Sequence, residues 1–218
     1  GNTITSGVYG ATIGGGGYSG FVNRVTDNYG TIGGGSYNTA GDNAGTTSDR
    51  NYATVGGGLG NTASGVVATV AGGQGNTASY SGTTIGGGVN NSAAGFYSTV
   101  PGGTDNAATA DYTFAAGNRA KANHQGAFVW ADSTAADFAS TAINQFAVRA
   151  NGGVNLQSTS GLFQFNGNTV WHAGNDGAGS TLDADLLDAG HGGNATGNIP
   201  INNTTLNTDL NADLLDGQ

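Results

Sequence analysis

Apolar and polar residues alternate in a short cassette that recurs through the first half of the chain. The cassette reads Thr, then Ile or Val, then a third residue that is usually Gly or Ala, then Gly-Gly. Its threonines are Thr12, Thr31, Thr54, Thr69, Thr84 and Thr99, and a degenerate copy runs from Tyr112 to Gly117. Successive copies are 19, 23, 15, 15, 15 and 14 residues apart. An internal repeat of this length predicts a solenoid built from stacked coils.

Two further columns repeat with the cassette. An Asn stands seven residues after the Thr in five copies, and an Ala follows two residues later. The asparagines are Asn38, Asn61, Asn76, Asn91 and Asn106, and the alanines are Ala40, Ala63, Ala78, Ala93 and Ala108. Residues that recur at one position of a coil are expected to stack above one another in neighbouring coils.

The residue after each Thr predicts how the coils pack. These residues are Ile13, Ile32, Val55, Val70, Ile85, Val100 and Phe114. We expect them to form an inward ladder in a parallel β-roll of about 15 residues per coil, with coils about 4.8 Å apart. The Ala column makes the second, tighter wall, and the Asn column makes a ladder at a turn. The predicted fold is all-β, and we expect a homo-oligomer because so thin a coil leaves apolar surface uncovered.

Residues Ala53–Gly65 resemble the head-domain repeat of trimeric autotransporter adhesins. The resemblance extends over about residues 8–122 and departs from the family in its Gly-richer cassettes and in two stretched early repeats. It implies a left-handed parallel β-roll, a homotrimer of three such rolls and a rigid extracellular head. It implies no catalytic residue.

The two stretched repeats predict loops. We place the extra residues of the first in Tyr18–Arg24 and those of the second in Gly41–Arg50. Insertions in solenoids emerge as surface loops that often bind ligands. The candidate receptor-binding residues are Tyr18, Phe21, Arg24, Asp49, Arg50 and Tyr52, which together would form a glycan platform. The alternative is that both loops are solvated decorations of an N-terminal cap.

The second half of the chain predicts a different fibre. Two hairpins are expected, one turning at Asn151-Gly152 between strands 145–150 and 153–157, and one joining 162–165 to 169–172. Strands this short suit an intertwined β-fibre to which three chains contribute. The predicted domains are a β-roll at 1–122, a β-stranded neck or shaft at 123–173 and an Asp-rich fibre segment at 174–218.

The end of the chain carries a second resemblance. Asn168–Asn175 is similar to a segment of bacteriophage tail-fibre proteins, and so is an Asp-rich element that occurs at Leu182–Asp188 and again at Leu210–Gly217. Many such fibres continue into a chaperone domain that cleaves itself off after trimerisation. No such domain is present in the sequence, so the resemblance implies a matured or truncated chain.

The candidate metal ligands lie in these same segments. Asp183, Asp185 and Asp188 offer hard oxygen ligands at close spacing, and threefold symmetry would multiply them. His172 would line the axis of a trimer, where a structural metal ion is the one candidate cofactor. The alternative is an amphipathic turn with Leu inward and Asp outward, and the absence of any Glu excludes an EF-hand loop.

Charge and composition exclude several classes of partner and chemistry. The net charge is −9, and residues 150–218 hold seven Asp and no Lys or Arg. Phosphate contacts need basic side chains, so nucleic acid is not an expected partner. The chain has no apolar run near the ~20 residues of a membrane span, so we expect no membrane insertion. The absence of Cys excludes disulfides and thiolate chemistry.

Catalytic motifs are also missing. His124, His172 and His191 are scattered, and no zinc-protease or nucleophile-elbow motif is present. The best carboxylate pairs are Asp105 with Asp111 and Asp132 with Asp137, neither in an evident cleft. We therefore expect a non-enzymatic extracellular fibre or adhesin that binds a host cell-surface glycan or protein. Alternatives are a self-assembling filament whose ends bind one another and, more weakly, a polysaccharide depolymerase.

Overall fold

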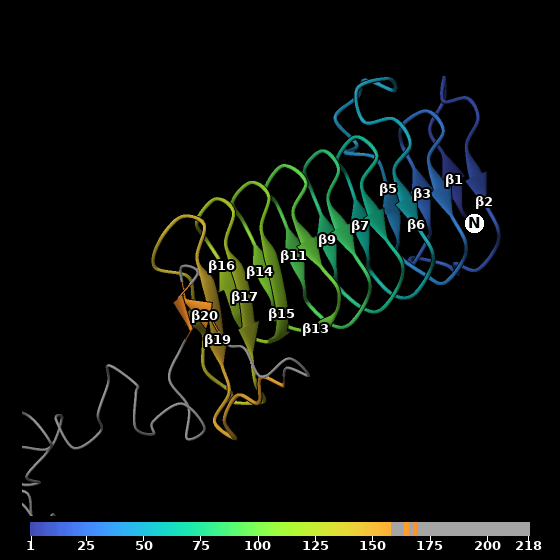
Figure 1. Ribbon diagram of the computed structural model, residues 1–218. Helices are drawn as coiled ribbons and strands as arrows, with labels where there is room; N and C mark the ends of the chain where they lie inside the picture. The colour runs from blue at the N-terminus through green and yellow to red at the C-terminus, as the bar shows by residue number, and fades with distance from the viewer. Residues whose placement is uncertain (158–163, 166–167, 170–218) are drawn as a thin grey trace, which may run out of the picture. The chain divides into compact units, whose positions relative to one another are not determined.

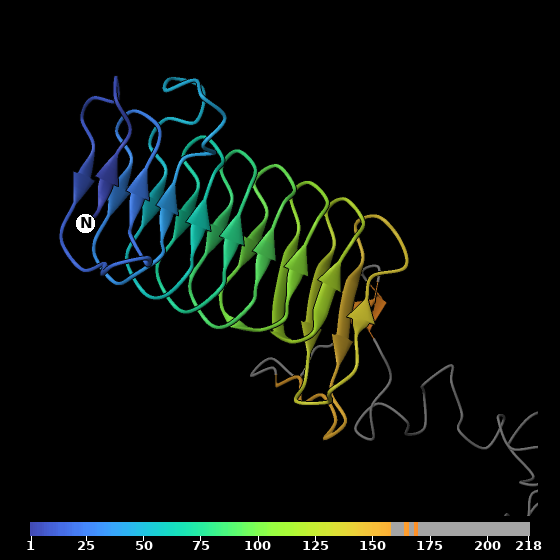
Figure 2. The same cartoon turned by 180° about the vertical axis from the view of Figure 1, so that it is seen from behind.

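The computed structural model describes residues 1–157, 164–165 and 168–169. These residues form β-strands and turns without any helix, so the predicted all-β class is confirmed. The chain divides into two units, Gly1–Val154 and Asn155–Gln218. The first unit is a parallel β-solenoid in which each coil gives one strand to each of two sheets (Figures 1 and 2).

The two sheets run side by side along the solenoid. The first is ordered β1 (Thr3–Ile4), β3 (Arg24–Val25), β5 (Thr39–Ala40), β7 (Thr62–Ala63), β9 (Thr77–Ala78), β11 (Ser92–Ala93), β14 (Ala107–Ala108), β16 (Ala120–Ala122) and β18 (Phe138–Ala139). The second is ordered β2 (Thr12–Ile13), β4 (Thr31–Ile32), β6 (Thr54–Val55), β8 (Thr69–Val70), β10 (Thr84–Ile85), β12 (Thr99–Val100), β15 (Phe114–Asn118), β17 (Phe128–Ala131) and β19 (Phe146–Arg149), with β13 (Gly103–Thr104) also beside β15.

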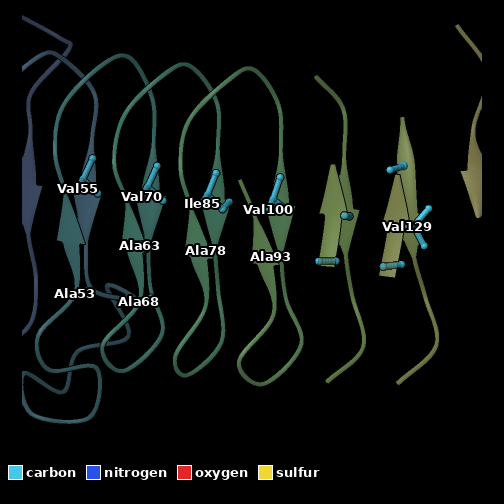
Figure 3. Packing of buried hydrophobic residues seen from close by; sticks show 14 of the residues in the cluster. Ala53, Val55, Ala63, Ala68, Val70, Ala78, Ile85, Ala93, Val100 and Val129 are labelled. Carbon is cyan, nitrogen blue, oxygen red and sulfur yellow. The ribbon is translucent and has the colours of Figure 1, made fainter. Parts of the chain in front are cut away.

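The Thr–apolar alternation fixes the register. Thr69 pairs with Thr84 and Val70 with Ile85, so like residues stack on like. Successive residues of a strand point to opposite faces, which sends each Thr outward and each Val or Ile into the coil. The inner residues from Ile32 to Val100 are fully buried, and Figure 3 shows those from Val55 to Val100 in a row along the axis of the solenoid. The bulky and small columns together fill an interior one side chain wide.

Phe114 departs from the predicted ladder. It pairs with Thr99, so it occupies the outward column, and the inner position is taken by the fully buried Ala115. The coil here keeps a spacing of 15 residues rather than 14, which leaves Thr113 inside the coil just before the strand. The prediction was wrong at this residue because it aligned Thr113 with the earlier threonines. Ile13, in the second strand of the chain, is only partly buried.

The predicted Asn ladder forms, and all five of its asparagines are buried. The backbone N–H of Asn61 donates to Oδ1 of Asn38 at 2.9 Å, and that of Asn76 donates to Oδ1 of Asn61 at 3.0 Å. Each Nδ2 also donates to Gly carbonyls; that of Asn61 bonds Gly57 at 2.9 Å and Gly73 at 2.8 Å. The side chains thereby satisfy the polar backbone of a tight corner that no strand hydrogen bonds reach.

The ladder is longer than the sequence repeat. Asn23 and Asn2 continue it upstream, because Oδ1 of Asn23 accepts from the N–H of Asn38 and Oδ1 of Asn2 accepts from that of Asn23. Downstream it ends at Ala120, whose N–H donates to Oδ1 of Asn106 at 2.9 Å. The adjoining glycines are required; Gly73, with φ +90°, would bring a Cβ into the carbonyl of Gly88.

Residues 123–149 were expected to begin a neck of different construction, and they instead continue the solenoid. Strand β17 pairs in parallel with β15 on one side and with β19 on the other, and β18 extends the first sheet beside β16. The stacking therefore passes the expected boundary at residue 122. The repeat escapes detection here because Phe replaces Thr in the outward column and the spacing changes, with 14 residues from Phe114 to Phe128 and 18 from Phe128 to Phe146.

One of the two predicted hairpins forms. A turn does lie at Asn151-Gly152, but β19 is already paired with β17 and residues 153–157 form no strand. The N–H of Asn151 bonds Oδ2 of Asp132 at 2.8 Å, which ties the turn to the solenoid. In the second unit, β20 (Gln164–Phe165) pairs antiparallel with β21 (Asn168–Thr169), as expected of the second hairpin. Residues 174–218 lie outside the described part.

Candidate functional site

The structure does not assemble the predicted glycan platform. Tyr18 and Phe21 lie in the turn from β2 to β3, whereas Asp49, Arg50 and Tyr52 lie in the turn from β5 to β6. These two turns form opposite edges of the coil, and Arg24 belongs to strand β3 between them (Figure 1). Both insertions occur, but the first ends before Arg24, which was predicted to lie within it, and the two interrupt different turns of the coil.

The first insertion makes a small aromatic cluster. Tyr18 and Phe21 form an isolated antiparallel bridge, and their rings stack with centroids 4.8 Å apart. Phe21 also meets Tyr37 of the next coil edge to face at 6.1 Å. All three rings are exposed, but their faces are already used against one another. This arrangement stabilises the turn and leaves little ring face for stacking against a sugar.

The second insertion is a loop held by one buried carboxylate, Asp27. Its Oδ2 accepts from the N–H of Asp42 at 3.1 Å, at the start of the loop, and its Oδ1 accepts from the N–H of Arg50 at 3.3 Å, at the end. The hydroxyl of Thr26 donates to the same carboxylate at 2.9 Å and accepts from the N–H of Asn43 at 3.1 Å. Asp27 is fully buried, so it fixes both ends of the loop to the solenoid wall.

The loop gathers charge around this clamp. Carboxylate oxygens of Asp27, Asp42 and Asp49 all lie within 4.8 Å of one another. Burial raises the pKa of Asp27, while the hydroxyl of Thr46 bonds Asp49 at 2.5 Å and lowers the pKa of that carboxyl. Arg50 offsets part of the negative charge through its Nε, 3.1 Å from Oδ2 of Asp42. Hard oxygen ligands of this kind suit Ca²⁺ chemically, although Arg50 competes for the same carboxylates.

Sequence reasoning selected Asp49, Arg50 and Tyr52 but missed Asp27 and Asp42. The available signal was the polar pair Thr26-Asp27, which precedes a coil whose following turn is eight residues longer than usual. A loop that leaves and rejoins a solenoid needs partners for its backbone at both ends. A buried acid next to the base of the loop meets that need.

Exposed aromatic side chains follow the same edge as this loop. Tyr29 and Tyr52 stack with centroids 4.7 Å apart and an interplanar angle of 4°, and Tyr9 meets Tyr29 edge to face. A second group, further along the edge, is Tyr80, Phe96, Tyr97 and Tyr112. Tyr29, Tyr52, Tyr97 and Tyr112 share one coil position, two residues before a strand, where φ is positive. The rings stack in two pairs, Tyr29 with Tyr52 and Tyr97 with Tyr112.

The far end of the solenoid holds a network around Arg149. Its Nε lies 3.0 Å from Oδ1 of Asp132, and its other nitrogens donate to the carbonyls of Ala136 and Thr134 at 2.9 and 3.0 Å. The hydrogen bond from Asn151 and contacts with Thr134 and Arg149 hold the pKa of Asp132 well below its usual range. The second member of this carboxylate pair, Asp137, is bound by Arg119 at 2.8 Å. Both acids therefore serve the loop architecture.

The other catalytic candidates are equally constrained. Asp105 and Asp111 lie in turns on opposite edges, before β14 and before β15, so they do not form a pair. His124 Nδ1 lies 2.9 Å from the hydroxyl of Ser140, but that hydroxyl also accepts two backbone N–H groups. Ser140 is only 3% exposed, which leaves a substrate no access to its oxygen.

One shallow hollow lies on the second sheet near the Arg149 network. It has a volume of about 300 Å³ and is lined by Gly117, Asn118, Trp130, Ala131, Asp132 and Ser133. The surface that it exposes is almost entirely apolar, and Trp130 is the one aromatic residue in its lining. The candidate metal ligands His172, Asp183, Asp185 and Asp188 lie outside the described residues.

Comparison with known proteins adds no family. No protein-family model matches the chain, and no curated protein matches it. Among the described residues, no helix has the length and apolar character needed to cross a membrane.

Proposed function

We propose that this protein is a non-enzymatic, homotrimeric extracellular fibre that attaches to a cell-surface receptor, with a glycan as the receptor class. It corresponds to the head and shaft of a phage tail fibre or an adhesin. The observation that carries the proposal is a ten-residue loop, Gly41–Arg50, that projects from a uniform solenoid and is clamped at both ends by Asp27 (Figure 1).

The body of the molecule supports a role in presentation. Parallel strand pairing runs without a break from β1 and β2 to β18 and β19, and the Asn ladder braces one corner through most of that length. Continuous pairing of this kind resists bending between neighbouring coils. A rigid rod presents its loops at fixed separations, and three copies would bind a repeating surface with the gain that multivalency gives.

The chemistry of the loop suits a polar receptor. Its side chains include the exposed Thr46 and Asp49 and the half-buried Arg50, which donate and accept hydrogen bonds in the way that sugar hydroxyls require. Tyr52 extends the same surface at the base of the loop. The low content of basic residues makes nucleic acid an unsuitable partner, and we propose no membrane insertion.

A loop exchange tests this proposal. The segment 41–52 lies between Ala40 and Ala53, and the next coil bridges the equivalent positions with only Ser-Gly-Val-Val, residues 64–67. Replacing 41–52 with Ser-Gly-Val-Val gives a coil of ordinary length without the loop. On an array of bacterial surface oligosaccharides and polysaccharides, the parent chain is expected to bind and the exchanged chain to lose binding.

The matched control places the same four residues at 79–82, on the same edge of a later coil. This control is expected to retain binding. Equal binding by the parent chain and the 41–52 exchange would remove the loop from the receptor site. Binding by none of the three chains to any glycan on the array would contradict the glycan as receptor.

A self-assembling extracellular filament is the second candidate. The observation that favours it is the parallel order of both sheets, which run from β1 and β2 at one end to β18 and β19 at the other. Two such ends are complementary in backbone polarity, and head-to-tail contacts of this kind generate open fibres. Electron microscopy of the purified chain without host cells separates the candidates, because only the filament predicts end-to-end fibres.

A further inference from the structure

The outer face of the second sheet changes its chemistry towards the end of the solenoid. From β2 to β12 the outward column consists of Thr, and the register places Phe114, Phe128 and Phe146 in that column in the last three coils. The next outward position holds a Gly, Ala or Pro from β2 to β12 and then Trp130 in β17 and Val148 in β19. Large apolar side chains therefore gather on one flat face of three coils, which we call the Phe face.

The rings of the Phe face are stacked, with Phe114 and Phe128 half-buried and Phe146 and Trp130 exposed. The ring centroids of Phe114 and Phe128 lie 4.6 Å apart, those of Phe128 and Phe146 lie 4.8 Å apart, and the rings are within 6° and 21° of parallel. Phe146 is 74% exposed and Trp130 is 38% exposed. The apolar hollow beside Trp130 extends the same face. An exposed apolar patch of this kind marks an interaction site in a soluble protein.

The period of the Phe face selects the partner. Its rings repeat at one coil spacing, and a partner that packs against all three rings must repeat at the same spacing. A second copy of this chain, with its solenoid parallel to the first, has that spacing by construction. The stacked rings form an open surface, and the hollow beside Trp130 is shallow, so the face suits packing against an identical copy better than it suits the enclosure of a peptide or a sugar.

Charge permits this packing. Two basic side chains of the last coils already form ion pairs within their own chain. Arg149 pairs with Asp132 at 3.0 Å, and Arg119 pairs with Asp137 at 2.8 Å. The centre of the face carries no charged side chain, and depletion of charge at the core is a feature of protein interfaces. Two copies can therefore meet here without burying an unpaired charge.

We propose that copies of this chain associate through the Phe face. This inference rests on the proposed homo-oligomer and names the surface that forms it: Phe114, Phe128 and Phe146, flanked by Trp130 and Val148. The face is confined to the last three coils, which leaves the edge that carries the Gly41–Arg50 loop outside the contact.

The first test is the double variant Phe128→Thr/Phe146→Thr. Thr is the residue that occupies the same column in the six earlier coils. The matched control is the double variant Tyr97→Asn/Tyr112→Asn, at two exposed positions on the edge of the solenoid. Asn is chosen because Asn144 occupies the same coil position, also with a positive φ. The mass of each full-length chain is measured by light scattering, and circular dichroism reports the β-structure. The control is expected to keep the mass of the parent oligomer. The Phe128→Thr/Phe146→Thr variant is expected to have the mass of a monomer.

A second test does not depend on the fold of that variant. The chain contains no Cys, so Phe146→Cys and, as a control, Thr69→Cys each introduce a single thiol. A short bis-maleimide is expected to join the Phe146→Cys copies into covalent dimers and to leave the Thr69→Cys copies unlinked. Equal linking at both positions would overturn the Phe face as the contact.

The outcomes separate the inference from the function on which it rests. An oligomeric parent with a monomeric Phe128→Thr/Phe146→Thr variant supports the Phe face. An oligomeric parent with an equally oligomeric variant, and no linking at Phe146→Cys, overturns the Phe face and leaves the fibre standing. A monomeric parent chain overturns both the shared contact and the homotrimeric fibre.

Discussion

At the scale of single residues, the solenoid depends on polar side chains that replace missing backbone partners. Asn76 shows the principle, since its Oδ1 accepts from Asn91 and its Nδ2 donates to the carbonyls of Gly72 and Gly88. Asp27 does the same for a loop rather than a corner. The Asn column was predictable because one residue type repeats at one position, whereas Asp27 occurs once and is signalled only by its place before the lengthened turn.

Asn76→Ala tests the ladder. The substitution leaves a buried N–H and two carbonyls without their partners, and each unsatisfied group costs about 1–3 kcal/mol. We therefore expect the free energy of unfolding to fall by about 3 kcal/mol or more in urea denaturation. Gln74→Ala, at an exposed position in the same coil, is the control and should change it by less than about 0.5 kcal/mol. Equal effects of the two variants would contradict the role of the ladder.

Asp132 gives a prediction for pH. Its pKa is lower in the folded chain than the ordinary value of 3.8, so the folded state favours the carboxylate more than the unfolded state does. The stability that this carboxylate contributes is complete above pH 3.8 and is lost as the pH falls from there through the folded pKa. Asp132→Asn should therefore be less stable than the parent chain at pH 7, with a difference that shrinks below pH 3.8. A difference that stays constant with pH would contradict the assignment.

At the scale of strands and coils, the sequence predicted the solenoid architecture better than it predicted where the solenoid ends. The Thr–apolar alternation, the Ala column and the positions of both insertions are all present as expected. The error at Phe114 came from a one-residue misalignment, which in a strand exchanges the two faces. The neck prediction failed because the coils beyond Asn118 keep the backbone pairing while they change the residues in each column.

Phe114→Thr tests the corrected register. An outward Phe114 loses its stacking with Phe128, worth about 0.5–1.5 kcal/mol, when Thr replaces it. A Phe inside the coil would cost about 3–5 kcal/mol on truncation. Thermal and urea unfolding of the variant should therefore report the smaller loss. A loss of about 3–5 kcal/mol in Phe114→Thr would place Phe114 inside the coil. An Ala115→Thr variant with the same free energy of unfolding as the parent chain would do the same.

At the scale of the whole molecule, the solenoid carries three surface features: the Gly41–Arg50 loop, the aromatic edge and the Phe face. The aromatic edge stabilises the turns, and we propose that the loop clamped by Asp27 contacts the receptor and that the Phe face joins the copies. The sequence could not place these features on separate faces. The position of each of the six predicted receptor residues depends on which turn or strand of the coil holds it. Side-chain type alone does not carry that information.

The homotrimer is the central claim, and the mass of the unmodified chain tests it most directly. Light scattering at several protein concentrations should give a species of three times 21.3 kDa that does not change on dilution. A mass that grows with concentration would favour the filament instead. A stable monomer of 21.3 kDa at every concentration would contradict the shared contact between copies and the trimeric fibre built on it.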